Sequence, residues 1–287
     1  MFPEYINREK LEKFIQDALT EDVGTGDHTS LASIPNGVKG KAKLIFKDEG
    51  IAAGIELADI IFKQIDPALS TEFFIKDGQH VKRGDIGFIV SGPTHSILKA
   101  ERLVLNCMQR MSGIATLTHH FTQLLRHTKT KVLDTRKTTP NFRMLEKWAV
   151  KIGGGVNHRF GLYDMILLKD NHIDYAGGVE KAILSTVDYL KNNNLNLKIS
   201  IEARSLKEVR EVIETGHVHR ILLDNMLTST LSEAVRLIDK RFETEASGGV
   251  NASNIKEIAD TGVDFISVGQ LTHSYKSLDI SLKAINE

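Results

Sequence analysis

The chain has 287 residues, 41% of them hydrophobic, which is enough for one large domain or for a barrel with a smaller companion domain. Basic and acidic residues are equal in number, so the formal net charge is zero. No overall field therefore draws the protein to nucleic acid or to an anionic membrane, and any anion site must be local.

The first residues contain no apolar core of signal-peptide length. Residues 1–5 run directly into the charged stretch Arg8–Lys10, and no later run approaches the ~20 apolar residues that a membrane helix needs. The single Cys107 excludes an internal disulfide and is typical of a reducing compartment. We therefore expect a soluble cytoplasmic protein.

The first part of the chain is predicted to form a small α+β domain. Apolar spacing predicts an amphipathic helix over Arg8–Leu19, ended by a turn-rich segment. Short β-like pieces follow between residues 40 and 92, with a helix predicted at Glu56–Gln64. A long helical pattern then runs from about Ser96 to His127, with a predicted break at Ser112-Gly113, and we place the domain boundary at that break.

Beyond the boundary, predicted strands alternate with predicted helices. The strands are Val132-Leu133, Met165–Leu168, Leu197–Ile201, Arg220–Leu223, Phe242–Ala246 and Phe265–Val268. The helices include Val179–Leu190, Leu206–Glu214, Leu231–Lys240 and Ile255–Asp260. This alternation indicates parallel βα units, either closed into a barrel or open as a doubly wound sheet.

Every predicted strand is followed by polar residues or glycine, and βα barrels carry their catalytic groups at these strand ends. In chain order the strand ends are Asp134-Thr135-Arg136-Lys137, Lys169-Asp170-Asn171-His172, Glu202 with Arg204, Asp224-Asn225, Ser247-Gly248-Gly249 and Gly269. Contact with water explains any single polar strand end. Six in succession, with charges sorted by sign, indicate a binding site.

The cations of this region favour a substrate with several negative charges, because arginine in particular matches carboxylates and phosphates. They are Arg136, Lys137, Arg159 and Lys169. Glu202 and Asp224 supply carboxylates, which suit magnesium or ribose hydroxyls and equally suit ion pairs with the lysines. The sequence leaves both interpretations open.

Two glycine turns end the last two strands, at Ser247-Gly248-Gly249 and Val268-Gly269. Barrels frequently build a phosphate site there from backbone N–H groups. The glycine-rich loop Gly153–Arg159 could also surround an anion, and the alternative for His158 is a local hydrogen bond alone. Behind Pro140, three basic residues at helical spacing are expected on a solvated face: Arg143, Lys147 and Lys151.

Together these segments resemble the quinolinate phosphoribosyltransferase family, the decarboxylating enzymes of NAD biosynthesis, over nearly the whole chain. The matching segments are Glu21–Ser30, Glu101-Arg102 through Asn106, Ser112–Thr116, Asp134–Pro140, Gly153–Arg159, Leu168–His172, Leu223–Met226, Ser247–Gly249, Gly269 and Leu271–Ser274. Two positions depart from the family wording. Gln270 replaces a usually small residue, which leaves a detail of the phosphate site open, and the stretch Glu202–Arg204 varies.

The resemblance implies an α/β protein with two domains. An N-terminal α/β sandwich would comprise residues 1–113, completed by residues 271–287, and an incomplete, TIM-like α/β barrel with the phosphoribosyl site would comprise residues 114–270. It also implies a homodimer, or a hexamer built as a trimer of dimers, with a shared active site. The implied substrates are quinolinate and phosphoribosyl pyrophosphate and the implied cofactor is Mg²⁺, with neither nucleic acid nor a membrane as partner.

The resemblance also implies roles for individual residues. The two carboxylates of quinolinate would be held by Arg102 of the neighbouring subunit and by Arg136, His158, Arg159 and Lys169. Lys137 would contact the phosphoribosyl donor, while Glu202 and Asp224 would face its ribose hydroxyls and magnesium, directly or indirectly. The 5′-phosphate would be cradled by Ser247, Gly248, Gly249 and Gly269, with Thr135 and Val268 also binding substrate. The expected catalytic residues are Lys137, Lys169, Glu202 and Asp224.

Two alternatives remain at this point. A related phosphoribosyl- or pyrophosphoryl-transferring enzyme of the same fold would use the same phosphate elements. A non-catalytic carrier module is the other, because Asp77–Asp85 faintly resembles the turns of lipoyl or biotin carriers. No lysine stands at the tip of a suitable hairpin there, which weighs against the carrier.

Overall fold

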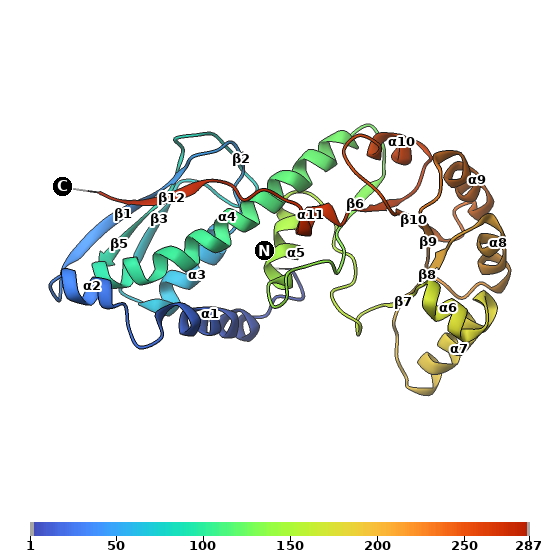
Figure 1. The fold of residues 1–287 in the computed structure, drawn as a ribbon, viewed down its shortest axis with the longest axis horizontal. Helices are drawn as coiled ribbons and strands as arrows, with labels where there is room; N and C mark the ends of the chain where they lie inside the picture. The colour runs from blue at the N-terminus through green and yellow to red at the C-terminus, as the bar shows by residue number, and fades with distance from the viewer. Residues whose placement is uncertain (1–2, 286–287) are drawn as a thin grey trace. The chain divides into compact units, whose positions relative to one another are not determined.

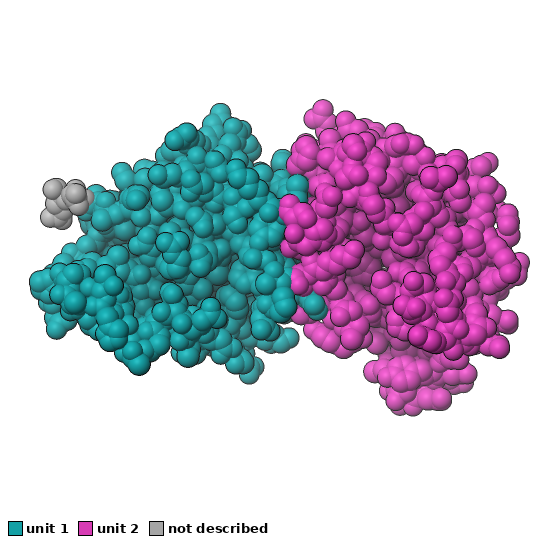
Figure 2. Space-filling model, viewed as in Figure 1, with its two compact units in different colours: residues 1–119, 139–154, 275–287 teal, residues 120–138, 155–274 magenta. Residues whose placement is uncertain are grey.

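The computed structural model describes residues 3–285, so residues 1, 2, 286 and 287 of the expected domain ranges lie outside the described residues. The chain forms two compact units, coloured separately in Figure 2. Unit 1 comprises Met1–His119, Thr139–Gly154 and Tyr275–Glu287, and unit 2 comprises His120–Thr138 and Gly155–Ser274.

Unit 1 contains a four-stranded antiparallel sheet in the order β12-β1-β5-β3 (Figure 1). Its strands are β1 (Lys39–Phe46), β3 (Ser70–Phe73), β5 (Ile86–Pro93) and β12 (Ile280–Ala284), while β2 (Gly50–Ile51) pairs with β4 (His80–Val81). Burial alternates along β1, where Ala42, Leu44 and Phe46 face the core, as the two-residue period of a strand requires. Because β12 pairs with β1, the C-terminal segment completes this sheet.

The helices of unit 1 are α1 (Arg8–Val23), α2 (His28–Ser33), α3 (Ile55–Ile65), α5 (Arg143–Ile152) and most of α4 (Thr94–Leu124). Three of them, α1, α3 and α4, were predicted from the sequence. The Asn7 side chain accepts a hydrogen bond from the Lys10 N–H and caps α1. The Asp77 carboxylate accepts from the backbone N–H groups of Ile55 and Glu56 and so caps α3.

The predicted break at Ser112-Gly113 is wrong, because α4 continues through both residues. Ser112 is buried. Its hydroxyl accepts a 3.0 Å hydrogen bond from the Ala53 N–H and donates a 3.1 Å hydrogen bond to the Ala53 carbonyl. A Cβ at Gly113 would lie against the backbone of Lys276. Both small residues are therefore explained by close contacts with other segments, and neither interrupts the helix.

The expected solvated face of α5 is also wrong for Lys147, whose exposed fraction is 0%. The neighbouring Glu146 is equally buried and accepts a hydrogen bond of 3.0 Å from Arg110 Nε on α4. A Cβ at Gly153 would lie only 3.0 Å from the Cα of Ala115, so the end of α5 approaches α4 closely. These contacts explain why residues 139–154 belong to unit 1, although they fall inside the range expected for the barrel.

Unit 2 contains a six-stranded parallel sheet in the order β6-β11-β10-β9-β8-β7. The strands are β6 (Lys131–Leu133), β7 (Ile166–Leu168), β8 (Ile199–Ala203), β9 (Arg220–Asp224), β10 (Glu243–Ser247) and β11 (Phe265–Ser267). All six predicted strands are therefore present. In the described part of the chain β6 and β7 do not pair with each other, which leaves the α/β barrel incomplete.

Helices connect these strands, and Figure 1 shows α7, α8 and α9 side by side along β7 to β10. The helices of unit 2 are α6 (Asp170–Ala176), α7 (Val179–Asn192), α8 (Leu206–Thr215), α9 (Thr228–Ile238), α10 (Ile255–Asp260) and α11 (Gln270–His273). Helix α9 ends two residues earlier than predicted, because Asp239 and Lys240 adopt positive φ angles of 47° and 59°. Within residues 3–285, no helix has the length and apolar character required to cross a membrane.

Candidate active site

A cavity of about 800 Å³ lies at the carboxyl ends of the unit 2 strands. Parallel pairing brings these ends to one edge of the sheet, and Ser247 of β10 stands directly opposite Asp224 of β9. The cavity gathers most of the predicted substrate-binding residues, namely Thr135, Arg136, Lys137, His158, Arg159, Lys169, Glu202, Asp224, Ser247, Gly248, Gly249 and Gly269.

Two predicted substrate-binding residues do not line this cavity. Val268 is fully buried, and its backbone N–H donates a 2.9 Å hydrogen bond to the carbonyl of Leu133, which anchors the turn before Gly269. Arg102 is an exposed residue of α4 in unit 1. Arg102 is expected to reach the active site of a neighbouring subunit, and that contact remains a prediction.

Two arginines of the cavity, Arg136 and Arg159, carry positive charge that no ion pair with a carboxylate of residues 3–285 neutralises. Arg136 Nε is buried and has no hydrogen-bond partner among the described residues. Burial and the neighbouring Arg136 guanidinium both lower the pKa of Arg159, which outweighs the opposite influence of Asp164 and Glu202. Two guanidinium groups that repel each other would be stabilised by a ligand with two negative charges.

Lys169 is the cation of the cavity that has a carboxylate partner. Its Nζ lies 3.1 Å from Glu202 Oε1, and Glu202 Oε2 accepts a 3.0 Å hydrogen bond from the Asp170 N–H. Of the two interpretations open for Glu202, the ion pair is therefore observed. Asp224 accepts a 2.7 Å hydrogen bond from the amide of Asn225 and faces the same cavity.

Asp134 supports the loop that carries two of the predicted ligands. Its buried carboxylate accepts hydrogen bonds from Asn157 Nδ2 at 2.6 Å and from the backbone N–H of His158 at 2.8 Å. His158 Nδ1 in turn accepts a 2.7 Å hydrogen bond from the N–H of Arg159. The backbone of this turn is thus fixed before any ligand binds.

Sequence reasoning missed Glu245, a fully buried residue of β10 that also lines the cavity. Its Oε2 lies 3.3 Å from His158 Nε2 and 3.0 Å from Arg220 Nη1, and its Oε1 accepts a hydrogen bond from Ser267. The available signal was a carboxylate inside a predicted buried strand, because such a residue is almost never buried without partners.

The glycine turns leave backbone exposed at one corner of the cavity. Gly248 has a φ of +98°, and a Cβ there would lie 3.0 Å from the backbone nitrogen of Asn225 and closer still to its side chain. At Gly269 a Cβ would lie 3.0 Å from His273 Nε2 and 3.2 Å from Lys137 Cδ. Gln270, which departs from the family wording, also lines the cavity.

Gly248→Ala is expected to lower the free energy of unfolding by about 1–3 kcal/mol through backbone strain, with a further loss from the contact with Asn225. Gly216→Ala is the matched control, because Gly216 also has a positive φ of +69° but open space around its Cβ. Urea denaturation of both variants measures the difference. An equal loss of stability in the two would contradict the close contact at Gly248.

Neither thiol nor metal chemistry has a preformed centre in the described residues. Burial raises the pKa of the Cys107 thiol to about 12, so a reactive thiolate is not available. Among residues 3–285, no group of three or more histidine, cysteine, aspartate or glutamate side chains is arranged to hold a metal ion. A divalent cation would therefore need ligands from the substrate in addition to protein carboxylates.

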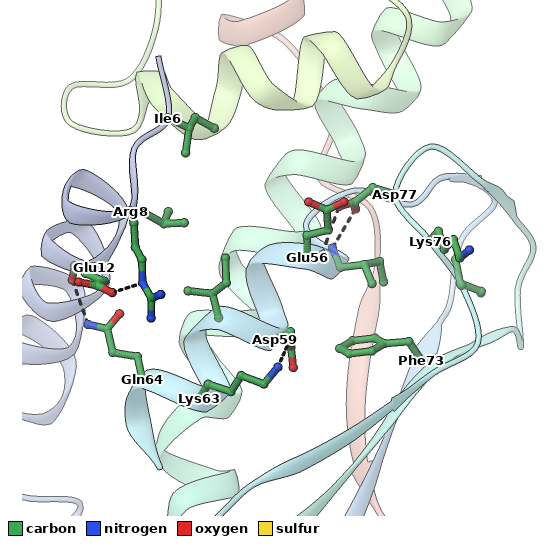
Figure 3. A pocket seen from close by; sticks show the side chains of 14 residues that line it. Ile6, Arg8, Glu12, Glu56, Asp59, Lys63, Gln64, Phe73, Lys76 and Asp77 are labelled. Carbon is green, nitrogen blue, oxygen red and sulfur yellow. Dashed lines mark hydrogen bonds and ion pairs between the residues drawn. The ribbon is translucent and has the colours of Figure 1, made fainter. Parts of the chain in front are cut away.

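A second cavity, of about 1010 Å³, lies in unit 1 beside α1 and α3 (Figure 3). Its charges pair locally, since Arg8 bonds Glu12 at 2.7 Å and Lys63 pairs with Asp59 on the next turn of α3 (Figure 3). Asp77, from the segment that resembles a carrier turn, caps α3, and burial raises its pKa. This cavity lacks the convergent, uncompensated charge of the cavity in unit 2.

Comparison with known proteins gives a consistent assignment. The family model described as "Quinolinate phosphoribosyl transferase, C-terminal domain" matches residues 114–283, and the corresponding N-terminal model matches residues 27–112. The chain is 48% identical to the chloroplastic nicotinate-nucleotide pyrophosphorylase [carboxylating] of Arabidopsis thaliana, covering 96% of this chain and 83% of the relative. It is 40% identical to the probable nicotinate-nucleotide pyrophosphorylase [carboxylating] of Bacillus subtilis, covering 96% and 94% of the two chains.

The likeness extends to three dimensions. The crystal structure of NadC from Streptococcus pyogenes matches with a TM-score of 0.92 and 36% sequence identity, covering 99% of this chain and 100% of that chain. A structure of the nicotinate-nucleotide pyrophosphorylase from Francisella tularensis matches with a TM-score of 0.91 and 35% identity, covering 98% of both chains.

Proposed function

The chain belongs to the quinolinate phosphoribosyltransferase family, and we propose that its unit 2 cavity converts quinolinate and phosphoribosyl pyrophosphate to nicotinate mononucleotide, carbon dioxide and pyrophosphate. The observation that carries this assignment to the cavity is the pair Arg136 and Arg159, whose positive charges have no carboxylate partner there among the described residues. A ligand with two adjacent carboxylates supplies the missing negative charge.

The cations divide the cavity between the two substrates. Arg136 and Arg159, with Lys169 and the His158 loop, bind the carboxylates of quinolinate, because guanidinium groups bind carboxylates with paired hydrogen bonds. Lys137 contacts the phosphoribosyl donor. The 5′-phosphate of that donor accepts hydrogen bonds at the corner formed by Ser247, Gly248, Gly249 and Gly269. Thr135 lines the same cavity, and the buried Val268 supports the turn at Gly269 without contacting the ligand.

The transfer step joins the pyridine nitrogen to the anomeric carbon of the ribose as the bond from that carbon to pyrophosphate breaks. The ribose ring passes through an oxocarbenium-like transition state, and the carboxylates of Glu202 and Asp224 stabilise its positive charge. Lys137 and Lys169 place positive charge near the anionic groups of the two substrates. The electron pair of the leaving group remains with pyrophosphate.

Decarboxylation follows on the product of transfer. The bond between the 2-carboxylate and the ring breaks, carbon dioxide leaves, and the electron pair stays on the ring carbon beside the positively charged nitrogen. A proton then replaces the carboxylate at that carbon. The ring nitrogen itself stabilises the electron density, so no separate electron-sink cofactor is required.

Magnesium is part of the proposal, and the donor chemistry of the cavity is compatible with it. Glu202 and Asp224 present carboxylate oxygens, and Mg²⁺ at phosphate substrates is commonly held by one or two carboxylates together with phosphate oxygens and water. When bound, it supplies positive charge to the pyrophosphate leaving group. Because Glu202 is already paired with Lys169, its contact with the ion would be indirect.

The test of this function is a product assay with purified protein, Mg²⁺, quinolinate and phosphoribosyl pyrophosphate. Nicotinate mononucleotide, carbon dioxide and pyrophosphate are expected in equal amounts. The alternative enzyme of the same fold predicts acceptance of nicotinate in place of quinolinate. That result, without turnover of quinolinate, would overturn the assignment, since nicotinate has only one carboxylate for the two guanidinium groups.

We further propose a homodimer, or a hexamer of three dimers, in which Arg102 of one subunit completes the site of the other. Arg102 is exposed on α4, as a contact across an interface requires before assembly. Mixing Arg102→Ala subunits with Arg136→Ala subunits is expected to restore activity, because some mixed dimers regain one intact site. Equal inactivity before and after mixing, with subunit exchange verified by mass, would exclude the shared site.

The proposed location is the cytoplasm. The plant relatives are named chloroplastic or mitochondrial, so their locations differ from the one proposed for this chain. Fractionation of cells that produce the protein at its natural level tests the proposal, and recovery with an organelle fraction would contradict it.

A further inference from the structure

A buried polar cluster stands beside the quinolinate end of the cavity and is not needed for the transfer chemistry described above. It consists of His158, Arg220, Glu245 and Ser267, with Glu243 at its edge. The side chain of Glu245 is fully buried, and that of His158 is 6% exposed. Buried groups with this many mutual contacts hold a single arrangement, so the cluster can fix the geometry of whatever it touches.

We propose that Glu245 is a positioning residue, which fixes the His158 ring and, through that ring, the backbone at Arg159 for binding the dicarboxylate. The proposal rests on the proposed function and deepens it. It assigns His158 a role through Arg159, where the family resemblance alone implies a direct contact with quinolinate.

The hydrogen bonds around His158 define which ring nitrogen carries the proton. Nδ1 accepts from the Arg159 N–H at 2.7 Å, and a nitrogen that accepts cannot also carry a proton. The proton of the neutral ring is then on Nε2, which lies 3.3 Å from Glu245 Oε2. Both ring nitrogens therefore have partners inside the protein.

Glu245 suits this task because a carboxylate only accepts hydrogen bonds. Three donors converge on it, from His158, Arg220 and Ser267. Burial opposes ionisation of Glu245, but the hydrogen bonds from His158 and Ser267 and the positive charge of Arg220 outweigh burial and lower the pKa of Glu245. Arg220 also offsets the negative charge, so that an anionic ligand can approach the cavity without facing a bare carboxylate.

The Arg220 side chain is held independently of Glu245, which makes a clean control possible. Arg220 also bonds Glu243 at 2.8 Å, and its guanidinium lies over the ring of Phe265 at 4.1 Å. Glu243 is on the same strand as Glu245 and shares Arg220 as partner, but it has no contact with His158 among the interactions of the described cluster. It therefore shares the strand and the Arg220 partner with Glu245, but it is more exposed and lies outside the contact with the histidine.

The substitution Glu245→Gln keeps the size of the side chain but replaces one acceptor oxygen with a donor NH₂. That NH₂ would donate to His158 Nε2, so the proton of the neutral ring would move to Nδ1. The acceptor for the Arg159 N–H is then lost. Arg159 is expected to lose its orientation, with little effect on the glycine corner that binds phosphate.

The kinetic test compares wild type with Glu245→Gln and Glu243→Gln. For Glu245→Gln we expect KM for quinolinate to rise roughly 10- to 100-fold, as misplacement of a binding group by about 1 Å can cause, while KM for phosphoribosyl pyrophosphate changes less than about twofold. Glu243→Gln should change neither KM by more than about twofold. Equal rises in both KM values for Glu245→Gln, or equal effects of the two variants, would overturn the positioning role.

A double-substitution cycle tests whether Glu245 acts through His158. Because the two residues belong to one chain of contacts, adding Glu245→Gln to His158→Ala is expected to raise KM for quinolinate by less than about twofold over His158→Ala alone. Multiplication of the two single effects would mean that Glu245 acts independently of His158.

Nitrogen-15 NMR of the histidines in the wild-type protein gives a readout independent of turnover and of the folding of any Glu245 variant. With His158 signals identified by their loss in His158→Ala, we expect a protonated Nε2 and an unprotonated Nδ1. A proton on Nδ1 would overturn the inference. If wild type instead fails to convert quinolinate, the proposed function fails, whereas an unchanged quinolinate KM in Glu245→Gln removes only the positioning role.

Discussion

Arg136→Ala is expected to lower kcat/KM for quinolinate by about 100-fold, which corresponds to about 2.7 kcal/mol of transition-state stabilisation, while the folded protein becomes no less stable. The loss follows because Arg136 has a buried Nε without a hydrogen-bond partner in the described chain, a group that a bound ligand would satisfy. The variant is expected to keep its folding stability because the substitution removes the repulsion between Arg136 and Arg159 in the free protein. Binding residues that are unfavourable for folding are typical of functional sites.

Steady-state kinetics and a thermal unfolding scan check both parts of this prediction. Arg236→Ala is the control, because Arg236 is an exposed arginine in the last turn of α9 in the same unit. It should retain normal kinetics. A marked fall in the unfolding midpoint of Arg136→Ala would show that the arginine mainly supports the fold, and near-normal kinetics would remove it from the site.

Lys169→Ala is expected to raise the Kd for quinolinate roughly 100- to 1000-fold, because truncating one member of a close charge pair costs about 2–5 kcal/mol or more. Two effects combine. The dicarboxylate loses a cation, and Glu202, whose side chain is 9% exposed, loses the partner that lies 3.1 Å from its Oε1. The unpaired carboxylate would then repel the incoming substrate.

Calorimetric titration with quinolinate separates these two effects without relying on turnover. Glu202→Gln removes the negative charge but keeps an oxygen that can accept from the Asp170 N–H. The double variant Lys169→Ala/Glu202→Gln is therefore expected to bind quinolinate about tenfold more tightly than Lys169→Ala, which corresponds to about 1.4 kcal/mol. Equal affinity of the two variants would contradict the repulsion.

The regular parts of the fold could be predicted from the sequence, because burial repeats with the period of each element. The six strands of unit 2 were all predicted within a few residues, and the parallel arrangement followed from the helices between them. The features that could not be predicted depend on contacts distant in sequence. Position 113 is a glycine within a helix because the backbone of Lys276 leaves no room for a Cβ, and Lys147 is buried on α5 despite its charge.

The candidate site shows the same division. Strand ends are local features, so the cations, the two carboxylates and the glycine turns could be located from the sequence, and the cavity brings them together. The interaction partners of these residues could not be predicted from strand ends. The pairing of Lys169 with Glu202 depends on the adjacency of β7 and β8, and the contact of His158 with Glu245 joins residues from a loop and a distant strand.

The most direct test of the central claim is a crystal structure of the protein grown with quinolinate. The two carboxylates of quinolinate are expected within hydrogen-bond distance of the Arg136 and Arg159 guanidinium groups, at the carboxyl ends of the unit 2 strands. Quinolinate bound elsewhere in the chain, with Arg136 and Arg159 left without an anion, would contradict the claim.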